Sequence, residues 1–97
     1  MILSTAVRDF GQSHSDANAT SVEFLNIEVD TGLMFAGIAS ESDDDAKTLR
    51  NRENARKAYD TILRFIGRVS LTAAESEALD MKMAKLKQGL QTLGESF

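Results

Sequence analysis

The sequence NARKAYDTILRFIGRV (residues 54–69) decides the fold, because it is the most clearly amphipathic stretch of the chain. At about 100° per residue, its apolar residues fall on one broad side of a helix. These residues are Ala55, Ala58, Tyr59, Ile62, Leu63, Ile66 and Val69. The opposite side carries a basic stripe, which consists of Arg50, Lys57, Arg64 and Arg68. Because helical patterns lie on both sides of this stretch, it predicts the central helix of a helical domain.

Composition agrees with one small helical domain. The chain has 97 residues, a length typical of a single domain. It contains no proline, a residue that would interrupt helix interiors. It also contains no cysteine, which excludes a disulfide framework, a thiolate nucleophile and a cysteine metal site. The net charge of -4 argues against a nucleic-acid partner.

Neither a targeting segment nor a membrane span is expected. Residues 1–7 lack the positive start and the long apolar core of a signal peptide. The longest apolar run, GLMFAGIA at residues 32–39, is far shorter than the roughly 18 residues that a membrane-spanning helix needs. We therefore expect a cytoplasmic protein without membrane contact.

The periodic segments predict three helices, at about residues 21–39, 43–66 and 73–93. Thr20 with Glu23, and Thr72 with Glu75, have the spacing of capping boxes. Gly67 and Gly94 are candidate C-caps, and residues 95–97 are expected to fray. Similar lengths and short loops favour antiparallel neighbours. The expected fold is an all-α, up-down-up three-helix bundle over residues 21–94, preceded by an irregular or partly helical arm over residues 1–20.

The third helix shows a narrow apolar seam at 4-3-4-3 spacing, typical of coiled-coil packing. Its members are Leu79, Met83, Leu86, Leu90 and Leu93. The run SESDDD at residues 40–45 ends one helix and begins the next, because carboxylates in a first turn suit the positive end of the helix dipole.

The first helix is apolar on two sides, and such a helix must be covered on both. One side carries Val22, Leu25, Val29, Leu33 and Ala36. The other side is the predicted interaction face, which consists of Phe24, Ile27, Met34, Phe35 and Ile38. Gly32 and Gly37 predict close packing, or a break near Gly37.

Two covers suit the predicted interaction face. The arm is one of them, through the apolar residues Ile2, Leu3, Val7 and Phe10. A second copy of the chain is the other, because two-fold contacts are the commonest oligomer interface. The polar connection over residues 11–19 leaves the arm's placement loose, which favours a homodimer through the first helix.

Catalytic and metal sites are not expected. His14 lies beside Ser13, Ser15 and Asp16, but triad geometry is rarely built from sequence neighbours. Asp43, Asp44 and Asp45 do not start a calcium loop, because the sixth position from Asp43 is Thr48 and the twelfth is Asn54. Glu28 and Asp30 have no pocket that would shift their pKa values for acid–base work. We therefore assign no catalytic residue, cofactor or metal.

The basic stripe has no interleaved aromatic residues, and acidic residues such as Asp60 dilute it. A solvated helix face is the preferred interpretation, with phosphate or acidic-peptide binding as the alternative.

Two segments resemble parts of a tetratricopeptide repeat. Gly32 and Phe35 are similar to the small and aromatic positions of its first helix, and Ala55, Tyr59 and Ile62 to the positions of its second. The three-helix microtubule-interacting-and-trafficking domain is comparable in length and helix count. Either resemblance implies a scaffold that binds partner peptides or helices.

The functional hypothesis is a small non-catalytic module that binds a protein or peptide partner. One alternative is a helical accessory or regulatory subunit of a larger enzyme complex. A small enzyme is the other alternative, and it would need a polar pocket that the sequence does not provide.

Overall fold

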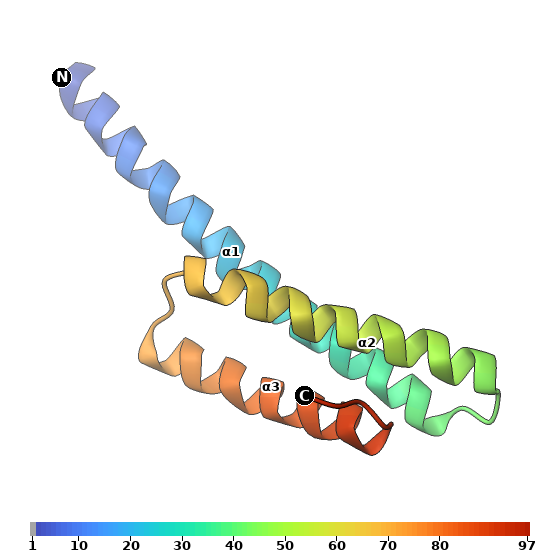
Figure 1. Cartoon of the computed structure of the whole chain (residues 1–97). Coiled ribbons are helices and arrows are strands. Elements are labelled where there is room, and N and C mark those ends of the chain that lie inside the picture. The colour runs from blue at the N-terminus through green and yellow to red at the C-terminus, as the bar shows by residue number, and fades with distance from the viewer. Residues whose placement is uncertain (1) are drawn as a thin grey trace.

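The computed structural model describes the backbone of residues 2–97 and the side chains of residues 16–97. Its elements are α1 (Ile2–Glu41), α2 (Asp45–Phe65), the short 3-10 turn η1 (Ile66–Arg68) and α3 (Ala73–Thr92). There is no strand within residues 2–97. Successive long helices run in opposite directions along the bundle (Figure 1). The predicted all-α, up-down-up three-helix bundle is therefore confirmed.

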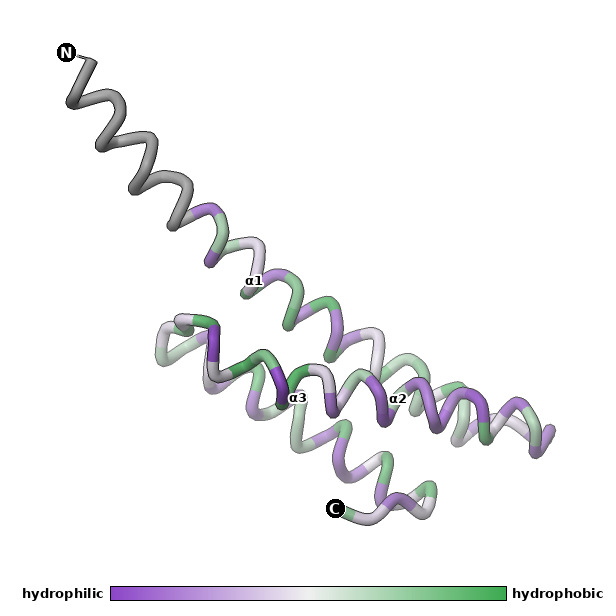
Figure 2. The backbone as a smooth tube through the Cα atoms, turned by 45° about the horizontal axis from the view of Figure 1, so that its top comes forward, coloured by the Kyte–Doolittle hydropathy of each residue, from purple (hydrophilic) through white to green (hydrophobic). Residues whose placement is uncertain are grey.

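The core lies where all three helices face one another. It is formed by Leu25, Val29 and Ala36 of α1, by Ala55, Tyr59 and Ile62 of α2, and by Leu79, Met83, Leu86 and Leu90 of α3. The seam predicted for the third helix is confirmed in four of its members, and Leu93 is half-buried against the same cluster. Figure 2 shows hydrophobic residues recurring along the bundled part of α1, whereas the first half of α2 is mainly hydrophilic.

Gly32 allows α1 to approach both other helices closely. A Cβ atom at this position would lie 2.8 Å from Cδ2 of Leu86 and 3.0 Å from Cβ of Ala58. These distances are too short for an added carbon atom, so the predicted tight packing at Gly32 is confirmed. Gly37 faces open space, and α1 continues past it to Glu41. The predicted break near Gly37 is therefore not found.

The starts of α2 and α3 are both capped by side chains, and of these the sequence predicted the capping box at Thr72. Asp44 is the N-cap of α2, and its Oδ1 accepts hydrogen bonds from the backbone N–H groups of Ala46 (2.9 Å) and Lys47 (3.3 Å). At α3, the Thr72 hydroxyl accepts from the Glu75 N–H at 3.1 Å, and the Glu75 carboxylate accepts from the Thr72 N–H at 2.9 Å. These bonds satisfy N–H groups that have no partner within the helix.

The expected start of the first helix is wrong. Thr20 lies inside α1, where backbone N–H groups already bond within the helix, so the capping box with Glu23 does not mark a helix start. Residues before 20 also contact the bundle. The Asn18 side chain donates through Nδ2 to the Ser70 carbonyl at 3.1 Å and accepts through Oδ1 from the Ser70 N–H at 3.0 Å. Asn18, which the sequence places in the arm, therefore contacts the loop before α3, and the division of the chain at residue 20 stays a prediction.

The two glycine caps have different outcomes. Gly94 follows α3 with φ at 100°, in the left-handed region that favours glycine. The N–H groups of Gly94 and Glu95 then bond the carbonyls of Gln91 and Leu90, at 3.0 and 2.9 Å. Gly67 is different, because it lies within η1 without a positive φ. The predicted cap at Gly67 is wrong, because the chain leaves α2 through a 3-10 turn.

Candidate functional site

Three of the five residues of the predicted interaction face are strongly exposed. The side chains of Phe24, Ile27 and Met34 are 43%, 56% and 54% exposed. Phe35 and Ile38 are half-buried, and Phe35 packs against the hydrophobic core. α1 therefore exposes apolar surface over fewer residues than the predicted interaction face, whose binding role stays a prediction.

The exposed residues belong to a regular row on α1, here called the outer seam. It consists of Phe24, Ile27, Thr31, Met34 and Ile38, at 3-4-3-4 spacing. Each member lies two positions after a buried residue that points toward the core. These inward residues are Val22, Leu25, Val29, Gly32 and Ala36. Two residues correspond to about 200° of helix rotation. The outer seam is therefore on the side of α1 that points away from the core.

Carboxylates flank the outer seam. Glu23 is exposed and Glu28 is half-buried, and neither forms an ion pair within the described side chains. Asp30 accepts a hydrogen bond from Nζ of Lys82 on α3, at 2.9 Å. Residues 16–41 contain no lysine or arginine. The surface around the seam is therefore negative. Glu28 and Asp30, considered above as paired carboxylates, are flanking residues in this arrangement.

A hollow of about 450 Å³ lies at the Phe24 end of the outer seam. It is lined by Thr20, Ser21, Phe24, Leu25, Phe65, Arg68 and Val69. The rings of Phe24 and Phe65 meet edge to face, with centroids 6.2 Å apart. The guanidinium of Arg68 lies 5.6 Å from the centre of the Phe65 ring. Phe24 therefore belongs to both the seam and the hollow, which makes the two surfaces continuous.

A second hollow, of about 520 Å³, lies between α1 and α3. Its lining consists of Leu33, Ala36, Gly37, Ser40, Lys85, Gln88, Gly89 and Thr92. It mixes apolar and polar side chains and has no row of exposed large apolar residues.

The basic stripe is exposed on α2. Arg50, Lys57 and Arg64 follow one another at intervals of seven residues and form no ion pair within the described side chains. Arg68 lies beyond α2, in η1, over the Phe65 ring. The geometry agrees with a solvated face, and its binding role stays a prediction.

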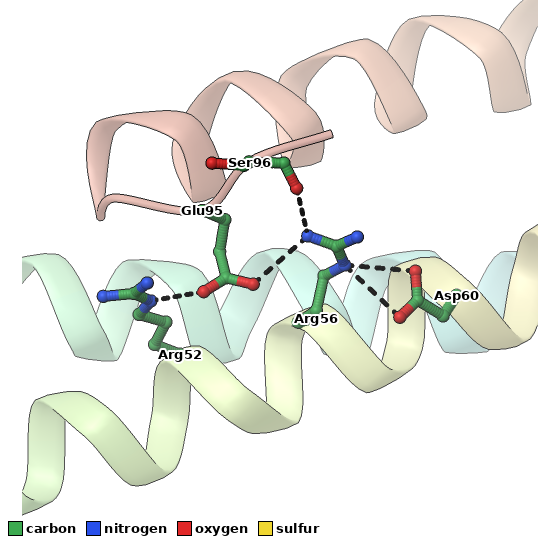
Figure 3. Close-up of polar contacts among 5 residues, drawn as sticks. All are labelled: Arg52, Arg56, Asp60, Glu95 and Ser96. Atoms are coloured by element: carbon green, nitrogen blue, oxygen red, sulfur yellow. Dashed lines mark hydrogen bonds and ion pairs between the residues drawn. The ribbon is translucent and has the colours of Figure 1, made fainter.

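The C-terminal tail, residues 94–97, is held against α2 by two arginines (Figure 3). Nε of Arg52 donates to Glu95 at 2.6 Å, and Nη1 of Arg56 donates to Glu95 at 3.2 Å and to the Ser96 carbonyl at 2.7 Å. Nε of Arg56 also donates to Asp60 at 3.1 Å. The hydrogen bond to Asp60 is the main reason why the pKa of Arg56 is raised above its usual value.

Phe97 completes this contact. Its ring meets Tyr59 at 4.9 Å between centroids, and the Arg56 guanidinium carbon lies 4.2 Å from its centre. Nζ of Lys87 on α3 lies 5.4 Å from the same ring centre. The expectation that residues 95–97 fray is therefore wrong. The spacing of Arg52, Arg56 and Asp60 was a visible signal on α2, but their partner on the tail is 39 to 43 residues away.

The other candidate residues do not assemble into a reaction centre in the described part. Asp43, Asp44 and Asp45 are exposed around the start of α2, where Asp44 serves as the cap. Among residues 16–97, no three His, Cys, Asp or Glu side chains are grouped so that they could hold a metal ion. The side chain of His14 lies outside the described residues, as do those of Ile2, Leu3, Val7 and Phe10, the arm residues considered as one of the two covers.

In the part of the chain that the structure describes, no helix combines the length and the apolar character needed to cross a membrane. Comparison of the chain with protein-family models, with curated proteins and with solved structures gave no match. The resemblance to tetratricopeptide repeats and to the microtubule-interacting-and-trafficking domain stays a prediction.

Proposed function

We propose that this chain is a non-catalytic helical interaction module, and that the outer seam of α1 binds a helix of a protein partner. One observation carries the proposal. Phe24, Ile27 and Met34 are each about half exposed and lie in a row on the side of α1 opposite the core. Contiguous exposed apolar surface of this kind is typical of interaction sites. An interaction role is also what the two family resemblances imply.

A helix is the partner shape that the spacing favours. The 3-4-3-4 row is the pattern of a coiled-coil seam, in which apolar side chains of one helix insert between those of another. From residue 24 to residue 38 the row is roughly 21 Å long, at 1.5 Å per residue. The hollow beside Phe24 offers a recess for one further apolar side chain of the partner at this end. Amphipathic helices that bind grooves use anchors at the same spacing.

Selection of binding helices tests the proposal. A display library of 21-residue amphipathic helices, with a fixed 3-4 apolar repeat and randomised flanking positions, is selected against the full chain. We expect selected helices to lose at least tenfold in affinity for the double variant Ile27→Ser and Met34→Ser. Serine removes apolar surface that is exposed, so the fold has little reason to change.

A matched control is available on α2. Leu49 and Leu63 are 54% and 53% exposed, close to the values for Ile27 and Met34. The double variant Leu49→Ser and Leu63→Ser removes similar apolar surface elsewhere and should bind the selected helices as the parent does. A library that yields no binder, or binders that ignore the α1 substitutions, would contradict the proposed function.

A further inference from the structure

We infer that the helix bound by the outer seam carries lysine or arginine on both flanks of its apolar stripe, and that a second copy of this chain is not the occupant. This inference rests on the proposed helix-binding function. It comes from the charges beside the seam, which are independent of the apolar exposure that supports that function.

The register of the seam assigns the flanking positions. With Phe24, Thr31 and Ile38 at heptad position a, and Ile27 and Met34 at position d, Glu23 and Asp30 take position g. Glu28 takes position e. Residues at e and g lie beside the apolar seam of a helix pair and set which partner is accepted and in which orientation. The central flanks of the seam are therefore acidic on both sides.

Self-association would bring these carboxylates together in either orientation. In a parallel pair, each g residue faces the following e residue of the other helix, so Glu23 would face the second copy's Glu28. In an antiparallel pair, g faces g and e faces e. The register that pairs Phe24 with Met34 then brings Asp30 to Asp30 and Glu28 to Glu28. Like charges across an interface are strongly unfavourable, and two-fold symmetry makes the Glu23–Glu28 contact of the parallel pair occur twice. The flanks thus oppose the homodimer that apolar exposure alone favoured.

Among the described side chains of residues 16–97, no cation neutralises the seam flanks fully. Lys82 pairs with Asp30 at 2.9 Å, but Glu23 and Glu28 have no ion pair within the described side chains. Arg50, Lys57 and Arg64 of the basic stripe belong to α2, and Arg68 lines the hollow at the Phe24 end of the seam. None of the four forms a described ion pair with α1. A partner helix with lysine or arginine at its own e and g positions would supply the missing positive charges.

Two synthetic peptides test the inference on the full chain. Both have three heptads with leucine at a and d, and they differ only in lysine or glutamate at e and g. We expect the lysine peptide to bind at least tenfold more tightly than the glutamate peptide at 150 mM salt, measured by fluorescence anisotropy. The preference should shrink at 500 mM salt, because salt screens exposed charges.

Charge-reversal variants test whether Glu23 and Glu28 cause the preference for the lysine peptide. The double variant Glu23→Lys and Glu28→Lys should prefer the glutamate peptide. The control double variant Glu53→Lys and Glu77→Lys changes the net charge equally, at exposed positions on α2 and α3, and should keep the parent's preference. A preference that both variants lose equally would show attraction by net charge alone and would overturn the inference.

The remaining outcomes separate the inference from the function on which it rests. Equal affinity for both peptides, abolished by Ile27→Ser with Met34→Ser, would leave helix binding intact and overturn the charge inference. Failure of every helix, in the peptide and library experiments alike, would overturn both. Light scattering should show a monomer. A dimer that becomes monomeric with the same two serine substitutions would identify a second copy as the occupant and overturn the inference.

Discussion

On the α2 side of the bundle, the C-terminal tail covers apolar surface, whereas the outer seam of α1 has no such cover among the described side chains. The Phe97 ring packs on Tyr59 at 4.9 Å, and Glu95 pairs with Arg52 and Arg56. Ile27 and Met34 on α1 stay 56% and 54% exposed. The flanking charges also differ, because Arg52 and Arg56 on α2 have acidic partners in the same chain. Glu23 and Glu28 on α1 have no described ion pair.

The difference shows which interactions a segment as short as the tail needs in order to stay ordered on a helix face. Ordering each tail residue costs about 1–2 kcal/mol of backbone entropy. Charged hydrogen bonds to Arg52 and Arg56, together with the ring contacts of Phe97, offset that cost. On α1, carboxylates stand beside the seam, so a covering segment must bring the positive charges itself. The closed surface thus contributes to the fold, and the open surface is the candidate for binding.

The largest expected effect is on the core that both surfaces share. Leu86 is fully buried at the centre of the bundle, beside Gly32. We expect Leu86→Asp to lower the free energy of unfolding by about 4 kcal/mol or more, because it places an unpaired charge in an apolar core. Denaturant unfolding followed by circular dichroism measures this change. A variant with the parent's midpoint would show that Leu86 is not a core residue.

Sequence periodicity predicted the core well, because burial in a helix bundle follows from angle alone. Leu79, Met83, Leu86 and Leu90 are buried as expected. The starts of α2 and α3, which have the side-chain caps Asp44 and Thr72, were predicted to within two residues. The start of the first helix was predicted wrongly at Thr20, because the residue types and spacing of a capping box also occur inside helices.

The candidate site was predicted in part. The outward position of Phe24, Ile27 and Met34 follows from the same angles as the core. The partial cover of Phe35 does not, because it depends on how closely neighbouring helices approach. The docking of Phe97 was missed because it joins residues far apart in the sequence, and no local pattern encodes such a pairing.

The next largest effect compares two glycines of α1. Gly32→Ala should destabilise the chain by about 1–2 kcal/mol, because its Cβ would lie 2.8 Å from Leu86 and 3.0 Å from Ala58. Gly37→Ala should stabilise it by about 0.5–1 kcal/mol, because nothing lies within 4 Å and alanine is the better helix former. Urea unfolding of both variants against the parent tests this. Equal shifts of the same sign would mean that α1 does not approach α3 closely at Gly32.

The smallest effect tests the comparison itself, through two apolar residues of similar exposure. Phe97 is 48% exposed on the tail, and Ile27 is 56% exposed on the outer seam. Phe97→Ala removes the contacts with Tyr59 and with the Arg56 guanidinium, so we expect the free energy of unfolding to fall by about 1 kcal/mol. Ile27→Ala removes no described core contact and gains helix propensity, so we expect a change within about 0.5 kcal/mol.

Thermal or urea unfolding of the two variants side by side gives the answer, with Ile27→Ala serving as the control for loss of exposed apolar surface. The comparison holds if only the tail substitution destabilises the chain, because Phe97 then contributes to the fold and Ile27 is free to contribute to binding. The contrast between the tail and the outer seam is contradicted if Ile27→Ala destabilises the chain as much as Phe97→Ala does. In that case the outer seam already contacts another part of the chain, and it is not an open binding surface.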